Sequence, residues 1–293
     1  MMSFFQSVPA FDSLARRVLF STLEEGRVDP ETVAMTWLLD RPGEGVAGFR
    51  HRGGIPLYPA SVIKLFYLAA FMRLAEAGEL TETEEDLRAL TAMIRVSSNE
   101  ATGHVVDRLT GTTGGPDLPP DDFETYVARR EAVQRQFRNW KWPELRDVAI
   151  RQKTYSDGPY GREWSYRQRV PGNVLTTDAT ARLLHAIAGG EIAGPERTGM
   201  MMDMLDRSFE RPAEAQAADP ENQVTGFLVE GTPAAIPVWS KAGWTSVTRH
   251  DAVLARLPNG ATTIIVMFGN GPERARDREF LPALARSVFA ALA

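Results

Sequence analysis

YPASVIKLFYLAAFM, residues 58–72, is an apolar stretch that carries one lysine, Lys64. Residues 61–77 are apolar on every side of a helix, which predicts a helix buried inside the fold and ended by Gly78. Lysine is rare in this chain: lysine and arginine together number 33, and because only four are lysines, 29 are arginines. Burial disfavours the charged form of lysine and can make it a neutral base, whereas arginine keeps its proton. We therefore interpret Lys64 as a residue selected for its chemistry.

The composition indicates a protein that acts on a small molecule. With 293 residues, 43% of them hydrophobic, the chain can bury a large core. A net charge of -5 provides no basic surface, so we expect neither nucleic acid nor a membrane as a partner. The absence of cysteine excludes disulfides and thiol nucleophiles, and the four histidines lack metal-ligand spacing. We expect no metal and no cofactor, and the composition does not indicate an oligomeric state.

No apolar run approaches the roughly 20 residues that a membrane-spanning helix needs. The N-terminal residues lack a basic segment followed by a continuous apolar one, which a secretory signal would show. We therefore expect a cytoplasmic protein, or a secreted one if a leader was removed ahead of this start.

The order of predicted elements indicates an α/β (α+β) fold. A helix at residues 11–25 and two strands at 31–40 and 45–54 come first. Three strands at 236–244, 250–257 and 262–269 and a helix from about Arg276 come last. Because the two ends must pair, we predict a five-stranded, largely antiparallel sheet flanked by helices, with a helical lobe inserted. We divide the single domain, residues 1–293, into an α/β lobe of 1–60 and 226–293 and a helical lobe of 61–225.

Residues 112–172 are unusually rich in proline, arginine and aromatic residues. A solvated linker would not carry so many aromatics, so we expect helices joined by long ordered loops. We expect Trp140, Trp142 and Trp164 to form an aromatic wall over a cleft, with plain core packing as the alternative.

Ser61 and Lys64 stand three residues apart in SVIK, so on a helix they share a face and the amine can reach the hydroxyl. Ser61 would lie in the first helical turn, where free backbone N–H groups favour developing negative charge. The plainer alternative is that Lys64 extends along the helix edge into water. Such a pair is common by chance, so its neighbours must decide.

Two further motifs accompany this pair. VSSNEAT, residues 96–102, offers Ser97 and Asn99 at a helix junction, although both residue types also serve as ordinary helix caps. WSKAGWTS, residues 239–246, places Lys241 and Gly243 on a strand, where glycine allows close approach of a ligand. Alternatively, Lys241 faces solvent and protects a sheet edge.

Ser61-X-X-Lys64, Ser97-X-Asn99 and Lys241-X-Gly243, in this order, resemble the motifs of the penicillin-recognising serine hydrolases, which include class A β-lactamases and D-alanyl-D-alanine peptidases. The resemblance implies the β-lactamase/transpeptidase-like fold and an acyl-enzyme mechanism. It implies that Ser61 is the nucleophile, Lys64 its base, Ser97 a proton relay, Asn99 a ligand of the substrate amide and Lys241 a source of positive charge. The backbone N–H groups of Ser61 and Trp244 would form the oxyanion hole, with Gly243 between the lysine and Trp244, and Arg249 would bind a substrate carboxylate.

The chain departs from the class A pattern at two places. Ala242 replaces the threonine whose hydroxyl would bind a substrate carboxylate. WKWPELRD, residues 140–147, lacks the glutamate and asparagine that would position the deacylating water. Glu144 and Glu163 are possible substitutes, or else ordinary surface carboxylates. We therefore expect slow turnover of β-lactams.

Three functions remain open at this level. The first is a serine hydrolase that acylates with a β-lactam, amide or ester. The second is a metabolic or biosynthetic esterase, amidase or D-alanyl peptidase-like acyltransferase without real β-lactamase turnover. The third is a non-catalytic penicilloyl-binding or sensor protein, against which the two motif lysines argue.

Overall fold

The computed structural model describes residues 4–293; residues 1–3, which we assigned to the α/β lobe, lie outside the described part. A five-stranded antiparallel sheet runs in the order β2-β1-β5-β4-β3. It confirms the predicted pairing of the two chain ends, because β1 pairs with β5. The strands are β1 (Val33–Arg41), β2 (Gly45–His51), β3 (Val238–Trp244), β4 (Thr248–Arg256) and β5 (Thr262–Asn270).

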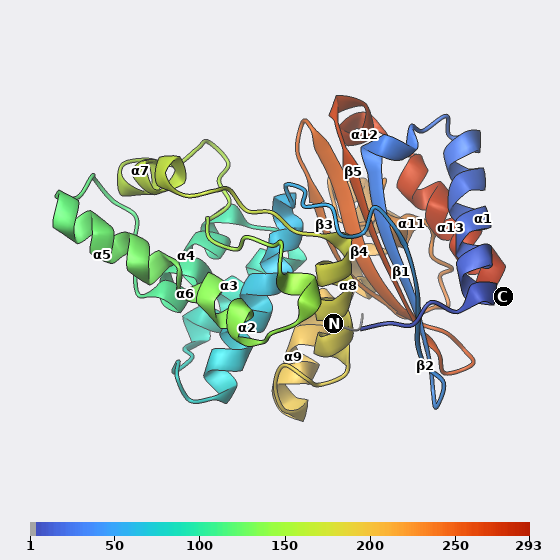
Figure 1. Ribbon diagram of the computed structural model, residues 1–293, viewed down its shortest axis with the longest axis horizontal. Helices are drawn as coiled ribbons and strands as arrows, with labels where there is room; N and C mark the ends of the chain where they lie inside the picture. Colours follow the sequence, from blue (N-terminus) through green and yellow to red (C-terminus); the bar gives the residue numbers. More distant parts are fainter. Residues whose placement is uncertain (1–3) are drawn as a thin grey trace.

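The sheet separates two hydrophobic cores, because successive side chains of a strand point to opposite faces. On β5, Ile264 and Val266 join the core of the helical side, whereas Ile265 and Met267 join the core of the opposite side. Helices α1 (Pro9–Glu25), α11 (Leu228–Gly231) and α13 (Phe280–Leu292) cover that opposite face (Figure 1). Helix α8 (Thr177–Ala188) covers the other face, between the sheet and the rest of the helical side. Both cores therefore depend on the same central strands.

The last helix begins later than predicted. A short helix α12 (Pro272–Arg276) ends at the expected start, and α13 begins only at Phe280. Asp277 causes the break, because its carboxylate accepts hydrogen bonds from the backbone N–H groups of Glu279 and Phe280.

The buried helix of the opening stretch also differs in detail. A 3₁₀ turn, η2 (Ala60–Ile63), precedes α2 (Lys64–Glu76), so Ser61 lies in the 3₁₀ turn and Lys64 begins the α-helix. Every residue of α2 from Lys64 to Met72 is buried, as the apolar pattern predicts. Around α2 pack α3 (Glu84–Arg95), α4 (Asn99–Thr110) and α9 (Pro195–Leu205). Helices α3 and α4 meet near Ser97, as expected.

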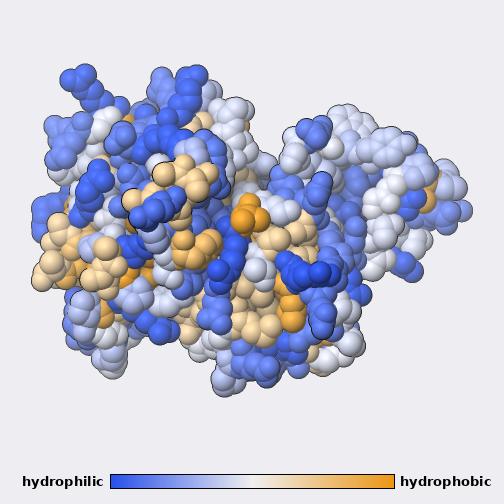
Figure 2. Space-filling view, turned by 180° about the vertical axis from the view of Figure 1, so that it is seen from behind, coloured by the Kyte–Doolittle hydropathy of each residue, from blue (hydrophilic) through white to orange (hydrophobic). Residues whose placement is uncertain are grey.

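The segment 112–172 forms an ordered extension of the helical side. It contains α5 (Pro120–Arg130), α6 (Ala132–Asn139), η3 (Pro143–Leu145) and α7 (Arg162–Arg169), which confirms the expectation of helices joined by loops. In Figure 1, α5 and α7 project farthest from the sheet. Figure 2, seen from behind, shows this projecting part as mainly hydrophilic and the apolar surface elsewhere as separate patches. Within residues 4–293, no helix is long and apolar enough to cross a membrane.

Candidate active site

Ser61 lies at the start of the buried helical segment with its hydroxyl unengaged. The preceding residue, Ala60, has φ of 46°, a left-handed conformation that a residue with a Cβ rarely adopts. Strained backbone of this kind is typical of functional sites. Among residues 4–293, no partner forms a hydrogen bond with the Ser61 hydroxyl. Its oxygen is therefore available to react with a ligand.

Lys64 is fully buried, which excludes the alternative that it extends into water. Its Nζ donates to the carbonyl oxygen of Ser97 at 2.5 Å, to Ser97 Oγ at 3.1 Å and to Asn99 Oδ1 at 2.9 Å. Burial lowers the pKa of Lys64 to about 7. Near neutral pH a large share of the amine is therefore uncharged. The structure gives Lys64 partners in Ser97 and Asn99, not a hydrogen bond with Ser61.

Lys241 enters the same cluster from β3 and is also fully buried, so it does not protect a solvent-facing edge. Its Nζ donates to Ser97 Oγ at 3.1 Å, to the carbonyl oxygen of Ala242 at 2.7 Å and to Gln223 Oε1. Burial, and then the neighbouring charge of Lys64, lower the pKa of Lys241 well below its usual value. Ser97 Oγ consequently lies between two amines that resist being charged together.

At the junction between α3 and α4, one serine caps a helix and the neighbouring serine faces the two lysines. Ser98, not Ser97, caps α4, because its hydroxyl accepts from the N–H of Ala101 at 3.1 Å. Ser97 has φ of 57°, and its hydroxyl points to the two lysines instead. Asn99 bonds Lys64 through Oδ1 and Ser156 through Nδ2. The capping alternative therefore holds for Ser98 alone.

The edge of β3 brings backbone N–H groups to the reactive serine. A Cβ built on Gly243 would lie 2.7 Å from the backbone nitrogen of Ser61, so only glycine allows this approach. In an antiparallel pair, alternate residues turn their N–H and C=O groups away from the partner strand. Ser240 and Ala242 do so on β3, because the Ser240 carbonyl accepts from Arg207 and the Ala242 N–H donates to Gln223. By the same alternation, the Trp244 N–H points out of this free edge.

Arg249 does not join the cluster. Its guanidinium donates to the carbonyl oxygens of Ala275 at 3.1 Å and Gly226 at 3.4 Å, and it lies 4.6 Å from the ring centroid of Phe227. The Phe227 ring in turn packs on Trp244 at 5.3 Å. Arg249 thus supports the back of β3, and its Nε and Nη1 donate to the main chain.

The two candidate carboxylates are engaged elsewhere. Glu144 accepts from the backbone N–H of Phe4 at 3.0 Å. Glu163 is buried, not at the surface, and contacts Arg130 at 3.3 Å and Lys153 at 2.9 Å. Burial alone would raise the pKa of Glu163, but the charges of Arg130 and Lys153 lower it. Glu163 therefore serves the internal ion network of the extension, and neither carboxylate contacts the lysine cluster.

The aromatic wall that we predicted is wrong. The ring centroids of Trp140 and Trp142 lie 4.7 Å apart, and both rings pack against the core of the helical side. The Cζ atom of Arg182 lies 3.9 Å from the centroid of the Trp142 ring. Trp164 lies apart on α7 and is 52% exposed. The positions of the tryptophans in the sequence did not reveal that Trp140 and Trp142, which flank α6 and η3, lie partly buried against the helical core.

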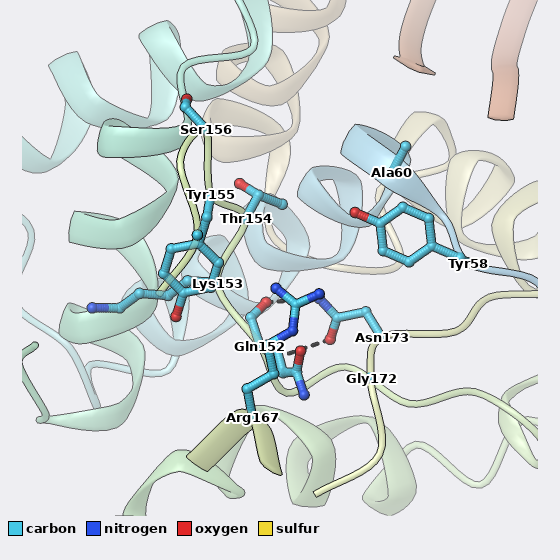
Figure 3. A pocket seen from close by; sticks show the side chains of 11 residues that line it. Tyr58, Ala60, Gln152, Lys153, Thr154, Tyr155, Ser156, Arg167, Gly172 and Asn173 are labelled. Atoms are coloured by element: carbon cyan, nitrogen blue, oxygen red, sulfur yellow. Dashed lines mark hydrogen bonds between the residues drawn. The ribbon is translucent and has the colours of Figure 1, made fainter. Parts of the chain in front are cut away.

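A polar cavity of about 510 Å³ lies beside the cluster, between Ala60 and Ser156. Figure 3 shows Tyr58 and Ala60 on one side of it and residues 153–156 on the other. Because Ala60 precedes Ser61 and Ser156 contacts Asn99, the cavity adjoins the reactive serine. A substrate therefore has room on this side.

Sequence reasoning missed Gln223, which is almost fully buried. Its Oε1 accepts from Lys241 Nζ and from the Ala242 N–H, and its Nε2 donates to the carbonyl oxygens of Ile94 and Arg95. The side chain thus ties β3 to the end of α3. A glutamine in an irregular loop carries no periodicity or spacing that would have identified it.

Comparisons with known proteins bear on the family and the fold. The sequence model of the beta-lactamase enzyme family matches residues 85–292, a range that includes Ser97 and Lys241 but begins after Lys64. No curated protein matches the sequence of the chain.

The fold is similar to three solved structures, all below 20% identity. PBP-A has a TM-score of 0.66 at 18% identity, covering 100% of this chain and 99% of that one. A beta-lactamase from Sphaerobacter thermophilus DSM 20745 has a TM-score of 0.66 at 19% identity, covering 95% and 97%. A point mutant of PBP-A, solved as an acyl-enzyme complex with penicillin-G, has a TM-score of 0.64 at 18% identity, covering 96% of each chain. At this identity the likeness shows the fold.

Proposed function

The chain belongs to the beta-lactamase enzyme family, and from this premise we propose that it is an active-site serine hydrolase in which Ser61 forms an acyl-enzyme with a β-lactam, amide or ester. The observation that carries the proposal is the pair of buried lysines that share Ser97 Oγ beside an unengaged serine. Burying two amines destabilises the fold, and groups whose acidity is shifted this strongly are concentrated at functional sites. A solved structure of similar fold holds a penicillin acyl-enzyme, which supports this chemistry.

In the first step, Ser61 Oγ bonds to the carbonyl carbon of the substrate and its proton passes to neutral Lys64. Negative charge develops on the carbonyl oxygen, which the N–H groups of Ser61 and Trp244 would stabilise; each such donor is typically worth about 3 to 4 kcal/mol. Lys64 bonds to Ser97 and Asn99 in this structure, and catalytic hydrogen bonds commonly tighten only once substrate is bound.

In the second half of acylation, the bond from the carbonyl carbon to the leaving oxygen or nitrogen breaks. The leaving atom takes the hydroxyl proton of Ser97, and Ser97 regains a proton from the Lys64 ammonium at 3.1 Å. Lys241, also 3.1 Å from Ser97 Oγ, donates a hydrogen bond that stabilises negative charge on that oxygen during the transfer. Asn99 would hold a substrate amide. Water must then hydrolyse the ester of Ser61 to complete turnover.

The proposal is tested by exposing the protein to a panel of fluorophosphonates, activated esters and β-lactams and measuring intact mass. We expect one adduct per chain, on the peptide that contains Ser61, and none in Ser61→Ala. Ser98→Ala is the matched control, because Ser98 caps α4 and takes no part in the cluster. An adduct on another residue, or none from any reagent, would refute the nucleophile.

The pH dependence of acylation should follow Lys64. Its pKa is lowered to about 7 by burial, and only the neutral amine accepts the serine proton. Acylation should therefore slow about tenfold for each pH unit below 7 and level off above it. The check is the second-order rate of ester acylation as a function of pH. A rate that keeps rising toward the usual pKa of lysine would show that another group is the base.

A further inference from the structure

A second pocket, apolar in character, lies next to Ser97 and includes Val96 and Gln223 in its lining. Its volume is about 290 Å³. The side chains of Val96 and Phe209, which both line it, are 72% and 41% exposed. Trp244 completes the apolar lining. Three apolar side chains therefore face a small hollow next to the cluster.

The position of this pocket matches the leaving group of the proposed reaction. Val96 directly precedes Ser97, the residue that would protonate the leaving atom. Gln223, which also lines the pocket, bonds Lys241. Trp244 lies at the end of the free β3 edge, where its N–H would face the carbonyl oxygen. The leaving group, which takes its proton from Ser97, would therefore lie between Val96 and Trp244.

The pocket offers poor partners for a negatively charged leaving group. Ala242 carries no hydroxyl, and two nitrogens of Arg249, Nε and Nη1, donate to backbone carbonyls. Asp219 and Glu221 line the pocket, and Asp219 has no ion-pair partner among residues 4–293. Arg95 is the one cation of the lining; its guanidinium lies 4.7 Å from the Phe209 ring centroid and donates to the carbonyl of Asp203.

One lining residue, Asn222, has an unused donor. Asn222 is only 7% exposed, and its Oδ1 accepts from the N–H groups of Val224 and Thr225, both at 3.0 Å. Its Nδ2 is buried, and none of the described residues supplies an acceptor for it. Leaving a buried donor unpaired is costly, so a ligand acceptor at this position would be favourable.

We propose, resting on the serine hydrolase function above, that this pocket selects acyl compounds whose leaving group is uncharged and apolar. Val96, Phe209 and Trp244 contact the apolar part, and Asn222 Nδ2 donates to an oxygen of the same group. Ordinary penicillins and cephalosporins carry a carboxylate next to the lactam nitrogen, which is the leaving atom. They are therefore poor substrates for acylation, whereas esters, open amides and lactams without that charge are good ones.

The test uses two aryl acetates that share the acyl group and differ only in a remote propanoic side chain on the phenol, free acid in one and methyl ester in the other. Their intrinsic reactivity is nearly equal, because the difference is far from the leaving oxygen. We expect kcat/KM to favour the methyl ester by about tenfold or more, the scale of a matched apolar contact. Equal values, or a preference for the acid, would overturn the proposal, and the latter would point to Arg95 as a carboxylate ligand.

Two variants assign the selectivity to this pocket. Phe209→Ala should reduce the ratio between the two esters several-fold, while Phe20→Ala, an exposed aromatic on α1, should leave it unchanged. Asn222→Asp keeps the acceptor for Val224 and Thr225 but loses the free donor, and it should slow the methyl ester. An unchanged ratio in Phe209→Ala would place the selectivity elsewhere and overturn the assignment.

Formation of the Ser61 adduct by the wild-type protein separates the two proposals, with Ser61→Ala as the control for the site of the adduct. If wild-type protein forms no Ser61 adduct with either ester or with a fluorophosphonate, the serine hydrolase function fails. If it forms the adduct at equal rates with both esters, the hydrolase function stands and only the leaving-group selectivity fails.

Discussion

Lys64→Arg should abolish most of the acylation of Ser61. Arginine keeps its proton in proteins, so the variant retains a positive charge but has no base to accept the serine proton. General-base catalysis is worth about 10² to 10⁴ in rate, and the acylation rate should fall by that factor. The measurement is the second-order rate of adduct formation with an activated ester, followed by intact mass.

The controls for this prediction address folding. Because Lys64 is fully buried, the larger arginine could disturb packing, and Lys64→Met tests the loss of the amine in a side chain of similar length. Lys141→Arg, at an exposed position, should leave the rate unchanged. Either Lys64 variant that folds and keeps more than about a tenth of the wild-type rate would remove Lys64 from the base role.

The acyl-enzyme should accumulate, because acylation outruns deacylation. The cluster of Ser61, Lys64 and Ser97 supplies what acylation needs. Glu144 bonds the backbone of Phe4 and Glu163 is held by Arg130 and Lys153, so neither of these two carboxylates is free to activate a water. Without a second base, hydrolysis of the ester should be about 10² to 10⁴ slower than in an enzyme that has one.

Mixing the protein with an activated ester should release a burst of one leaving group per active site, followed by a slow steady state. A penicillin at high concentration should react slowly and leave a long-lived adduct on the Ser61 peptide. Rapid turnover with no detectable adduct would contradict the prediction. Glu144→Gln and Glu163→Gln would then show which carboxylate activates the water, with loss of turnover but not of the first acylation.

The spacing of residues along the chain determined much of this protein. Short apolar runs bounded by turn residues specified the five strands, and β1, β4 and β5 are buried almost continuously because both faces of the sheet are covered. Three short motifs located Ser61, Lys64, Ser97, Asn99, Lys241 and Gly243, and the fold brings the lysines, Ser97 and Asn99 into hydrogen-bond contact. Such features are local, because a few consecutive residues decide which side chains share a face.

Other properties came only from contacts between distant parts of the chain. Ser97 and Lys241 are 144 positions apart, and their hydrogen bond, like the lowered pKa of Lys241, exists only once β3 packs against the end of α3. Two further contacts likewise depend on partners that residue spacing does not predict. Glu163 is buried in an ion network, and Trp142 packs against Arg182.

Arg249 and Gln223 show the same division at the substrate side. From the sequence, Arg249 on β4 was predicted to bind a substrate carboxylate. In the structure its Nε and Nη1 donate instead to the carbonyl oxygens of Ala275 and Gly226. Gln223 belongs to no sequence motif or periodic pattern, yet it accepts a hydrogen bond from Lys241 and holds that side chain in place. Residue type and periodicity specify what a side chain is able to do and which face of its element it occupies. The packed neighbours decide its charge state, its partners and the room left for a substrate, because desolvation and hydrogen bonding act through space and not along the chain.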